Sequence, residues 1–330
     1  MNPTQVPPQV RIWQIGLGFA NTAVLHALVK FGVIEQLREQ PKRLPELAQS
    51  CQLNADMLYR TLRFAAVLDV VTQDGEQYAL TDVGRLLLKD VPGSLYMGLM
   101  LIGSKPWQSA WHNFAHSLTT GENAFEPVMG ASFFEYLDQH PDYGAPFNQW
   151  QTILTTNAAR AITDAYDFTP IGTVCDIGGG QGILLKNILT ANPHLRGVLY
   201  DQANVVKDHV LADLVQRVEI QTGNFFERMP AAEVLLMKNI LHDWSDEKCQ
   251  VILSQCRQAM QPGSRLLIVE MVIASPTDLM GAFYDLHMQV VLGGRERTEN
   301  EFSLLLQKAG MKLNRIIPTK SPLKIIEASL

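Results

Sequence analysis

The chain has 330 residues, of which 47% are hydrophobic and 18% are charged, and its formal net charge is −6. The high apolar fraction excludes a mainly disordered chain. The negative net charge argues against a nucleic-acid-binding protein, which normally carries a basic face. At roughly 100–200 residues per domain the length suggests two domains, and the low charged fraction suggests surface that an oligomer covers.

The first 95 residues have the pattern of a helical module that ends in a hairpin. The stretch 12–30 is apolar but interrupted by polar side chains. We expect it to form one helix buried against protein rather than a membrane span, which needs about 20 mainly apolar residues. Apolar residues recur at helical spacing in 54–68, and Asp74-Gly75 predicts a tight turn between two short strands. This order is typical of a winged helix. Such a module binds DNA or, in the less specific interpretation, serves as an interaction or dimerisation module.

Residues 96–165 are expected to be helical and are rich in aromatic side chains. Trp107, Phe114, Phe133 and Trp150 are among them. Aromatic residues at this density most often form a core or an interface. They also suit the wall of a pocket for a flat apolar ligand, and the sequence leaves both interpretations open.

From about residue 173, strands alternate with helices, which predicts a parallel, doubly wound sheet. The expected strands are 174–177, 197–200, 218–220, 233–237, 266–269, 312–317 and 324–327. The expected helices are 183–190, 246–260 and 299–309. Thr298 and Glu301 have the spacing of a capping box at the start of the last helix.

The four cysteines form no CxxC pair and have no histidines at zinc-finger spacing. We therefore expect no disulfide framework and no metal site, and we expect a reducing, cytoplasmic setting. The start of the chain is polar and proline-rich, without a basic segment followed by an apolar one, so no signal peptide is expected.

A glycine-rich loop follows the first expected strand of the sheet. It begins with Asp176 and has glycines at 178, 180 and 182, which departs from the GxGxxG pattern of dinucleotide sites. A second acid, Asp201, ends the next strand, where a carboxylate can take both hydroxyls of a ribose. This pairing favours S-adenosylmethionine over a nicotinamide dinucleotide, with a plain tight turn as the alternative.

Four segments carry a resemblance to a known family. They are 174–182, 223–226, 238–247 and 293–298, and the third contains His-Asp-Trp and the fourth Gly-Gly-Arg-Glu-Arg-Thr. In these segments the chain resembles the plant- and polyketide-type O-methyltransferases, of the caffeic acid and hydroxyindole methyltransferase kind. The N-terminal pattern and 124–137 also fit, so the resemblance covers nearly the whole chain.

The resemblance implies an α/β fold, with a Rossmann-like class I methyltransferase domain and a winged-helix-like dimerisation domain before it. It places the dimerisation domain at 1–95, and an acceptor-pocket segment plus the S-adenosylmethionine-binding domain at 96–330. It also implies a homodimer whose N-terminal helices are swapped around the partner and contribute to its pocket. The expected ligands are S-adenosylmethionine and a small-molecule acceptor, with no nucleic acid and no membrane.

His242 follows the fourth expected strand, at the carboxyl edge of the sheet where ligands bind. A phenol has a pKa near 10, so a histidine, with a pKa of about 6.5, is a suitable base to remove its proton. The family's catalytic base matches His242, and family carboxylates that flank it match Glu270 and Glu296. We expect these two to orient His242 or the acceptor. The plainer interpretations are a polar strand end and a charge near a helix start.

The resemblance also implies which residues hold S-adenosylmethionine. They are Asp176, Gly178, Gly180, Asp201, Asn224, Phe225 and Lys238. At position 224 most relatives have Asp. The amide keeps an acceptor oxygen for the adenine amino group but loses the charge.

By resemblance, the acceptor pocket draws on Phe147, Trp150, Phe283, Met288 and Leu292. The expected reaction is methylation of a phenolic or enolic hydroxyl of a small specialised metabolite. One alternative is a non-methylating reaction on the same fold, such as hydroxylation, decarboxylation or a pericyclic step; the other is a winged-helix regulator that senses a ligand. The intact His242 favours methyl transfer. The second candidate helix of the N-terminal module has only two basic residues, which disfavours the regulator.

Overall fold

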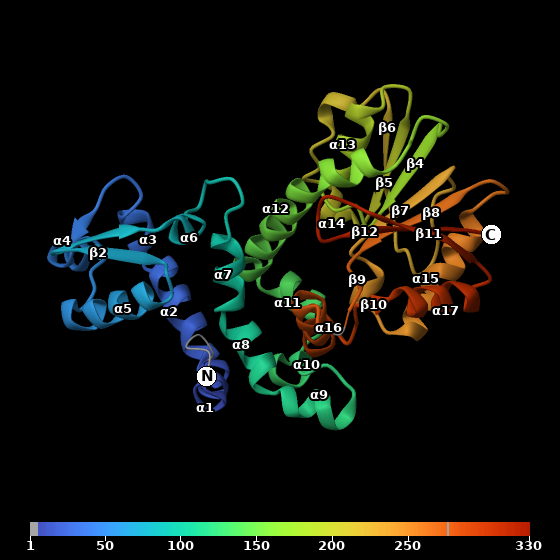
Figure 1. Ribbon diagram of the computed structural model, residues 1–330. Helices are drawn as coiled ribbons and strands as arrows, with labels where there is room; N and C mark the ends of the chain where they lie inside the picture. Colours follow the sequence, from blue (N-terminus) through green and yellow to red (C-terminus); the bar gives the residue numbers. More distant parts are fainter. Residues whose placement is uncertain (1–5, 276) are drawn as a thin grey trace. The chain divides into compact units, whose positions relative to one another are not determined.

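The computed structural model describes residues 6–275 and 277–330, which form parts of two compact units (Figure 1). The first unit comprises Met1–Ser109 and His140–Trp150, and the second comprises Ala110–Gln139 and Gln151–Leu330. Each unit has its own hydrophobic core.

The first unit consists of short helices and a small antiparallel sheet with the strand order β1-β3-β2. Its elements are α1 (Pro8–Gly16), α2 (Gly18–Lys30), α3 (Val33–Gln36), β1 (Lys42–Arg43), α4 (Leu44–Ser50), α5 (Ala55–Val67), β2 (Val71–Asp74), β3 (Gln77–Leu80), α6 (Asp82–Arg85) and α7 (Tyr96–Ile102). Leu28, Leu47, Leu62 and Tyr78 from these helices and the sheet meet in the core. The predicted helix over 54–68 and the hairpin after it are confirmed.

The predicted single helix over 12–30 is wrong. The chain forms α1 and α2 instead, bent by 44° at Leu17, and glycines at 16 and 18 flank the bend because glycine disfavours a helix interior. No residue of α1 is buried, and Trp13 is 68% exposed, so burial within one chain begins only near the end of α2. Within the described residues, no single helix has the length and apolar character to cross a membrane. The bent pair α1 and α2 meets those two criteria together.

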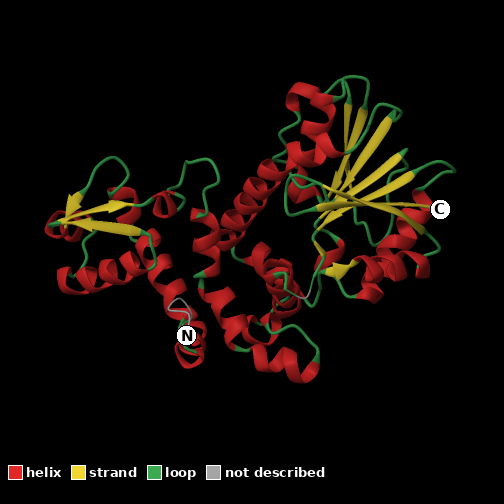
Figure 2. Ribbon diagram, in the orientation of Figure 1, coloured by secondary structure: helices red, strands yellow, loops and turns green. Residues whose placement is uncertain are grey.

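A seven-stranded sheet with the order β11-β12-β8-β7-β4-β5-β6 forms the centre of the second unit (Figure 2). The strands are β4 (Thr173–Ile177), β5 (Arg196–Asp201), β6 (Val218–Thr222), β7 (Val234–Lys238), β8 (Arg265–Glu270), β11 (Lys312–Pro318) and β12 (Lys324–Ser329). The strands from β8 to β6 are parallel, whereas β12 and β11 are antiparallel to their neighbours. The predicted strands and the mostly parallel sheet are confirmed, with strand ends shifted by at most two residues.

The helices α12 (Pro141–Ala165), α13 (Ile183–Ala191), α15 (Asp246–Ala259) and α17 (Glu299–Lys308) cover the two faces of this sheet. Two further helices are α8 (Lys105–His112) and α16 (Leu279–Leu292). Cys175 of β4 belongs to a core with side chains of α15 and α17, whereas its neighbour Val174 belongs to a second core with α12 and α13. Strands buried on both faces define the doubly wound α/β class. Thr298 and Glu301 form the predicted capping box at the start of α17.

The first unit reaches beyond residue 95, where we expected the dimerisation domain to end. α7 packs against α2, and its Leu99 joins the core of this unit. The first turns of α12 belong to the unit as well, because Gly98 lets the ring of Trp150 approach closely: a Cβ at Gly98 would lie 2.9 Å from it. The limits 1–95 and 96–330 of the functional domains stay predictions.

Candidate active site

The strand order reverses between β4 and β7, and several expected site residues stand at strand ends there. β5 and β6 lie on one side of β4, whereas β7 and β8 lie on the other. Asp201, Lys238 and Glu270 are the last residues of β5, β7 and β8, and the glycine loop follows β4. In open α/β sheets, ligands bind outside the carboxyl ends of the strands at such a reversal.

Two glycines of the loop serve different purposes. Gly178 and Gly180 have φ angles of +64° and +60°, which L side chains rarely adopt. A Cβ at Gly178 would collide with Cδ1 of Ile240 and lie 3.8 Å from the ring of Phe225. A Cβ at Gly180 would meet nothing within 4 Å. Packing therefore requires a glycine at 178, whereas the backbone at 180 borders open space that a ligand can approach.

Asp201 and Asp176 supply carboxylates to the loop. Asp201 accepts hydrogen bonds from the backbone N–H groups of Gly180, at 2.9 Å, and Gln202, at 2.7 Å. Asp176 is 1% exposed, and its Oδ2 has no hydrogen-bond partner among the described residues. Burial and then the charge of Asp201 raise the pKa of Asp176 to about 7. A buried oxygen without a partner suits a ligand that brings a donor or a positive charge.

An aromatic cluster lies beside the loop. The ring of Phe226 lies 4.9 Å from that of Phe225 and 5.0 Å from that of Trp244. Asn224 is engaged locally, because its Oδ1 accepts from the Phe226 N–H at 3.0 Å and its Nδ2 donates to Glu227 at 3.1 Å. Its oxygen keeps one lone pair for a ligand. The sequence reasoning missed Trp244, although it stands next to His-Asp in one of the family segments.

His242 lies between two carboxylates in the short turn Leu241–Asp243 after β7. Its Nδ1 is 2.8 Å from Oε1 of Glu296, and its Nε2 is 3.3 Å from Oδ1 of Asp243. Burial disfavours the charged imidazole, but Asp243 and Glu296 outweigh it and raise the pKa of His242 to about 9. The ring therefore carries a positive charge at neutral pH in this arrangement. The sequence reasoning also missed Asp243, the next residue along the chain.

Glu270 holds the turn that carries His242. Its Oε1 accepts from the backbone N–H groups of Ile240, Leu241 and His242, at 3.1, 2.7 and 3.2 Å. Burial raises the pKa of this carboxyl, and the charge of His242 opposes that effect. The contacts assign Glu270 to the backbone of the turn rather than to the imidazole ring; a direct part in orienting the acceptor stays a prediction.

Arg297 anchors the same turn from the segment that carries Glu296. It is 1% exposed and donates to Oδ1 of Asp246 at 2.8 Å. It also donates to the carbonyl oxygens of Leu241 and Trp244, both at 3.1 Å. These bonds tie the turn to the starts of α15 and α17. The guanidinium is therefore structural.

Lys238 lies in a cluster of buried charges. Burial lowers its pKa to about 8, against the attraction of Asp176, Asp243 and Glu270. His242 and Glu296 add one cation and one carboxylate, and Arg297 lies near Glu270, so four carboxylates face three cationic groups. An excess of buried carboxylates favours a ligand that carries positive charge. Across the described residues, no group of His, Cys, Asp or Glu side chains is arranged to hold a metal ion.

The expected acceptor-lining residues belong to both units. Phe147 and Trp150 lie on the part of α12 that belongs to the first unit. Phe283 and Met288 lie on α16 in the second unit, and Met288 is buried. The part that these four residues take in an acceptor pocket stays a prediction.

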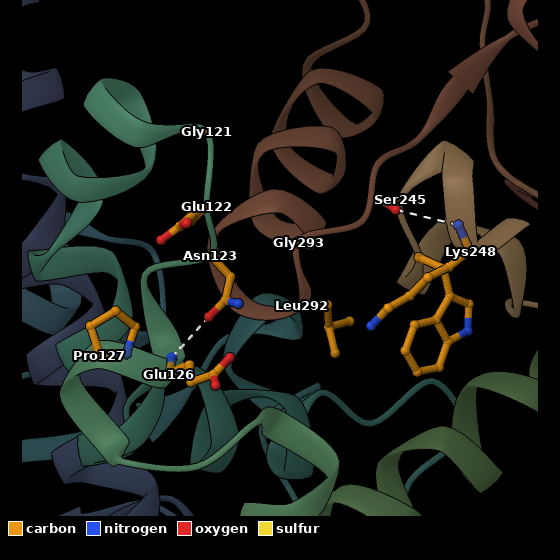
Figure 3. Close-up of a pocket in the computed structure, with 10 residues that line it drawn as sticks. Gly121, Glu122, Asn123, Glu126, Pro127, Ser245, Lys248, Leu292 and Gly293 are labelled. Carbon is orange, nitrogen blue, oxygen red and sulfur yellow. Dashed lines mark hydrogen bonds between the residues drawn. The ribbon is translucent and has the colours of Figure 1, made fainter.

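Leu292, the fifth expected acceptor-lining residue, borders a cavity of about 560 Å³ (Figure 3). Trp244 and Lys248 line the cavity as well. Glu122 and Glu126 lie across from Lys248 (Figure 3). The amine of Lys248 lies 4.9 Å from the centre of the Trp244 ring. The lining is largely polar, so this cavity differs from the apolar acceptor wall that the sequence predicts.

The chain is similar to known O-methyltransferases over almost its whole length. Residues 111–312 match the model of the O-methyltransferase domain, and residues 13–90 match that of the O-methyltransferase dimerisation domain. The phenazine O-methyltransferase PhzM of Lysobacter antibioticus is 37% identical over 98% of this chain and 96% of that protein. The structure of the mitomycin 7-O-methyltransferase MmcR matches with a TM-score of 0.92 and 32% identity, over 97% of each chain. That of NcsB1, an O-methyltransferase from neocarzinostatin biosynthesis in complex with S-adenosylmethionine and 2-hydroxy-5-methyl naphthoic acid, matches with a TM-score of 0.84 and 28% identity, over 94% of this chain and 96% of that one.

Proposed function

The chain belongs to the O-methyltransferase family, and we propose that it methylates a phenolic or enolic hydroxyl of a small metabolite, with S-adenosylmethionine as methyl donor and His242 as general base. One observation carries this proposal: His242, paired with Glu296 at 2.8 Å, stands beside the glycine loop where the strand order reverses. Family membership favours an enzyme over a ligand-sensing regulator. The intact base favours methyl transfer over a non-methylating reaction.

The residues at the glycine loop suit S-adenosylmethionine. The lone pairs of Asp201 that remain after its two backbone hydrogen bonds can accept from ribose hydroxyls. Oδ2 of Asp176 can accept from an ammonium group, and Phe225 and Trp244 offer apolar surface to an adenine. The excess of carboxylates suits a ligand with a sulfonium and an ammonium. When bound, this cofactor supplies an electrophilic methyl group on a cationic sulfur.

His242 must be neutral before it can take a proton. Its pKa, about 9 in this arrangement, falls when another cation binds among the same carboxylates, because they then stabilise that charge as well. The neutral ring takes the hydroxyl proton at Nε2, while Glu296 holds Nδ1–H, fixes the tautomer and stabilises the imidazolium that forms. Glu270 keeps the backbone of the turn in place, and thereby the direction of Nε2.

Asp243 shares Nε2 of His242 with the incoming hydroxyl. Their 3.3 Å separation means that the hydroxyl has to displace Asp243 or lie beside it. Burial raises the pKa of Asp243 to about 7, so this carboxyl can hold a proton that the imidazole gives up. We therefore infer that Asp243 takes part in setting the protonation state of the base.

The first unit is proposed to form a homodimer with a second copy of the chain. Ile12, Trp13 and Phe19 are between 65% and 70% exposed, and they lie within or next to the segment that matches the dimerisation domain. Large apolar side chains gathered on a surface mark an interaction site. The swapped arrangement of these helices belongs to this proposal, and light scattering of the wild type and of Phe19→Asp tests it. A monomeric wild type contradicts it.

The test of function is methyl transfer by the purified protein. With S-adenosylmethionine and a panel of phenols that includes 2-hydroxy-5-methyl naphthoic acid, mass spectrometry should find a methylated product. His242→Asn should lower kcat by about 10²–10⁴-fold, the range that general bases supply, and a circular-dichroism spectrum like that of the wild type would show that the variant is folded. His112→Asn, at an exposed position, is the matched control. Activity of His242→Asn within a few-fold of the wild type removes the base assignment, and no product from any phenol removes the reaction class.

A further inference from the structure

The carboxylate of Glu296 depends on its own backbone for its place beside His242. Its Oε1 lies 2.8 Å from Nδ1 of the imidazole. Its Oε2 is buried and has no hydrogen-bond partner among the described residues. Glu296 is 2% exposed, so bulk water has little access to the carboxylate. The distance between the carboxylate and the imidazole therefore depends on where the backbone of Glu296 lies.

The segment 293–298, which links α16 to α17, lies directly on the turn that carries His242. The backbone N–H of Arg295 donates to the carbonyl oxygen of His242 at 2.9 Å. Gly294 lies so close to the same carbonyl oxygen that a Cβ at this position would collide with it. The missing side chain at 294 therefore allows the segment to approach, and the approach brings Glu296 up to the turn.

Asp285 of α16 holds the N–H group of Glu296 itself. Its Oδ1 accepts this hydrogen bond at 3.1 Å. A carboxylate acceptor makes a charge-assisted hydrogen bond, which is stronger than one between neutral groups. α16 also packs against the turn Leu241–Asp243, so Asp285 and His242 are carried by elements that are in contact. Asp285 thus fixes the backbone of the residue whose side chain pairs with His242.

The charged groups around Asp285 belong to the same segment and to α17. Burial raises the pKa of Asp285, whereas the charge of Arg295 and the N–H of Glu296 lower it. The charges of Glu296 and Glu301 add to the effect of burial. Arg295 also donates to Glu301 at 2.6 Å. Asp285 therefore lies among groups of both signs, and its hydrogen bond to Glu296 fixes its direction.

Three carboxylates and one imidazole act on the charge of His242 from the elements around it: Asp243, Glu270, Glu296 and His287. Burial lowers the pKa of His287 to about 3, so this residue of α16 is neutral at pH 7. Among the described residues, no hydrogen bond or ion pair joins Asp285 to His242. An effect of Asp285 on the base therefore has to pass through Glu296.

We propose that Asp285 is a positioning residue for the base: by holding the backbone N–H of Glu296, it keeps the carboxylate of Glu296 at Nδ1 of His242. This inference rests on the proposed function, because it takes His242 as the base for the acceptor hydroxyl. A carboxylate displaced from the imidazole fixes the tautomer less well and stabilises the imidazolium less. A misplacement of about 1 Å can slow an enzyme by about 100-fold.

Two substitutions of Asp285 separate its placement from its charge. Asp285→Asn keeps an acceptor oxygen in place and removes the charge, whereas Asp285→Glu keeps the charge and moves the carboxylate by one methylene group. In the pH dependence of kcat/KM for the acceptor, Asp285→Glu should lower the midpoint by about 0.5–1 pH unit, because His242 loses part of the attraction of Glu296. Asp285→Asn should keep a midpoint near that of the wild type. The reverse order, or two unchanged midpoints, overturns the proposal.

Asp278→Glu is the matched control for these variants. Asp278 is the N-cap residue of α16, and its Oδ1 also accepts a backbone N–H, from Gly281 at 2.9 Å. The same change at this position should leave the midpoint where it is in the wild type. Circular-dichroism spectra like that of the wild type would show that the variants are folded.

A double-mutant cycle with Glu296→Gln tests the route by which Asp285 acts. Without the carboxylate of Glu296, Asp285 has no charged partner of His242 to position. Residues in one network give non-additive effects. Asp285→Glu should therefore shift the midpoint in the wild type and leave it unchanged in Glu296→Gln. Shifts of equal size in both backgrounds mean that Asp285 acts by another route, which contradicts the proposal.

Nitrogen NMR of the histidine rings keeps this inference separate from the proposed function. The titration follows the protonation of His242 without turnover, and His242→Asn assigns its signals. The pKa of His242, about 9 in this arrangement, should be lower in Asp285→Glu than in the wild type and in Asp285→Asn. This order in a protein that methylates no phenol removes only the proposed function. Methyl transfer with the same pKa of His242 in all three proteins removes only this inference.

Discussion

Replacing Glu296 by glutamine should lower the pKa of His242 while leaving the imidazole in place. The two side chains meet at 2.8 Å and are 12% and 2% exposed, so water screens their attraction little. An opposite charge within about 4–6 Å shifts a pKa by about one to three units. Because the pKa of His242 is raised to about 9, the midpoint of its titration should fall by about one to three pH units in Glu296→Gln.

The pH dependence of kcat/KM for the acceptor measures this change. A base accepts a proton only when neutral, so the rate rises with pH and levels off above the pKa. At pH 7, two units below a pKa of about 9, only about 1% of His242 is neutral. In Glu296→Gln the rise should begin at lower pH, and the plateau should fall by about 10–100-fold because the imidazolium loses its charged partner. Saturating S-adenosylmethionine should lower the midpoint of the pH profile in the wild type and in Glu296→Gln. The experiment therefore compares the difference between the two midpoints.

Glu299→Gln is the matched control for this experiment. Glu299 is exposed at the start of α17, and its replacement should leave the pH profile unchanged. Equal melting temperatures would show that both variants are folded. A Glu296→Gln profile with the wild-type midpoint would refute the reasoning, since the group that ionises would then not be the imidazole paired with Glu296.

Three further predictions follow from the same contacts. Asp201→Ala should weaken binding of S-adenosylhomocysteine at least tenfold by calorimetry, whereas Asp208→Ala, at an exposed position, should not. Glu270→Ala leaves three backbone N–H groups without their acceptor and should lower the free energy of unfolding, measured in urea, by about 3–5 kcal/mol; Glu270→Gln should lose less. S-adenosylmethionine binding near pH 8 should release protons, seen as a dependence of the heat on buffer ionisation, and His242→Asn should release fewer.

The sheet could be predicted from the sequence because its central strands are buried on both faces. β7 and β8 contain the continuous apolar runs 234–237 and 266–269, which are typical of strands buried on both faces when turn residues flank them. The bend at Leu17 could not be predicted in this way, because the stretch around it is also apolar. A glycine costs a helix only about 1 kcal/mol, so two glycines give a weak signal. No buried side chain holds α1 in line with α2.

Within the site, the motifs predicted which residues are present better than they predicted which groups those residues contact. A carboxylate at the end of β8 was expected, but its reach to three backbone N–H groups depends on how the turn after β7 folds. Asp243 was missed because adjacent side chains diverge on helices and strands. Asn239 has a φ of +53°, and the turn after it lets His242 and Asp243 face each other.

The charge balance of the site explains why His242 is an imidazolium. Four buried carboxylates cannot all stay ionised beside Lys238 and a neutral His242, because isolated buried charges are costly. Protons make up the difference: His242 holds one with a pKa of about 9, and the pKa values of Asp176 and Asp243 are raised to about 7. A cationic ligand among these groups takes over the role of the protons, so we expect His242 to become neutral when that ligand is bound. The protonation state of His242 is then coupled to cofactor binding by electrostatics.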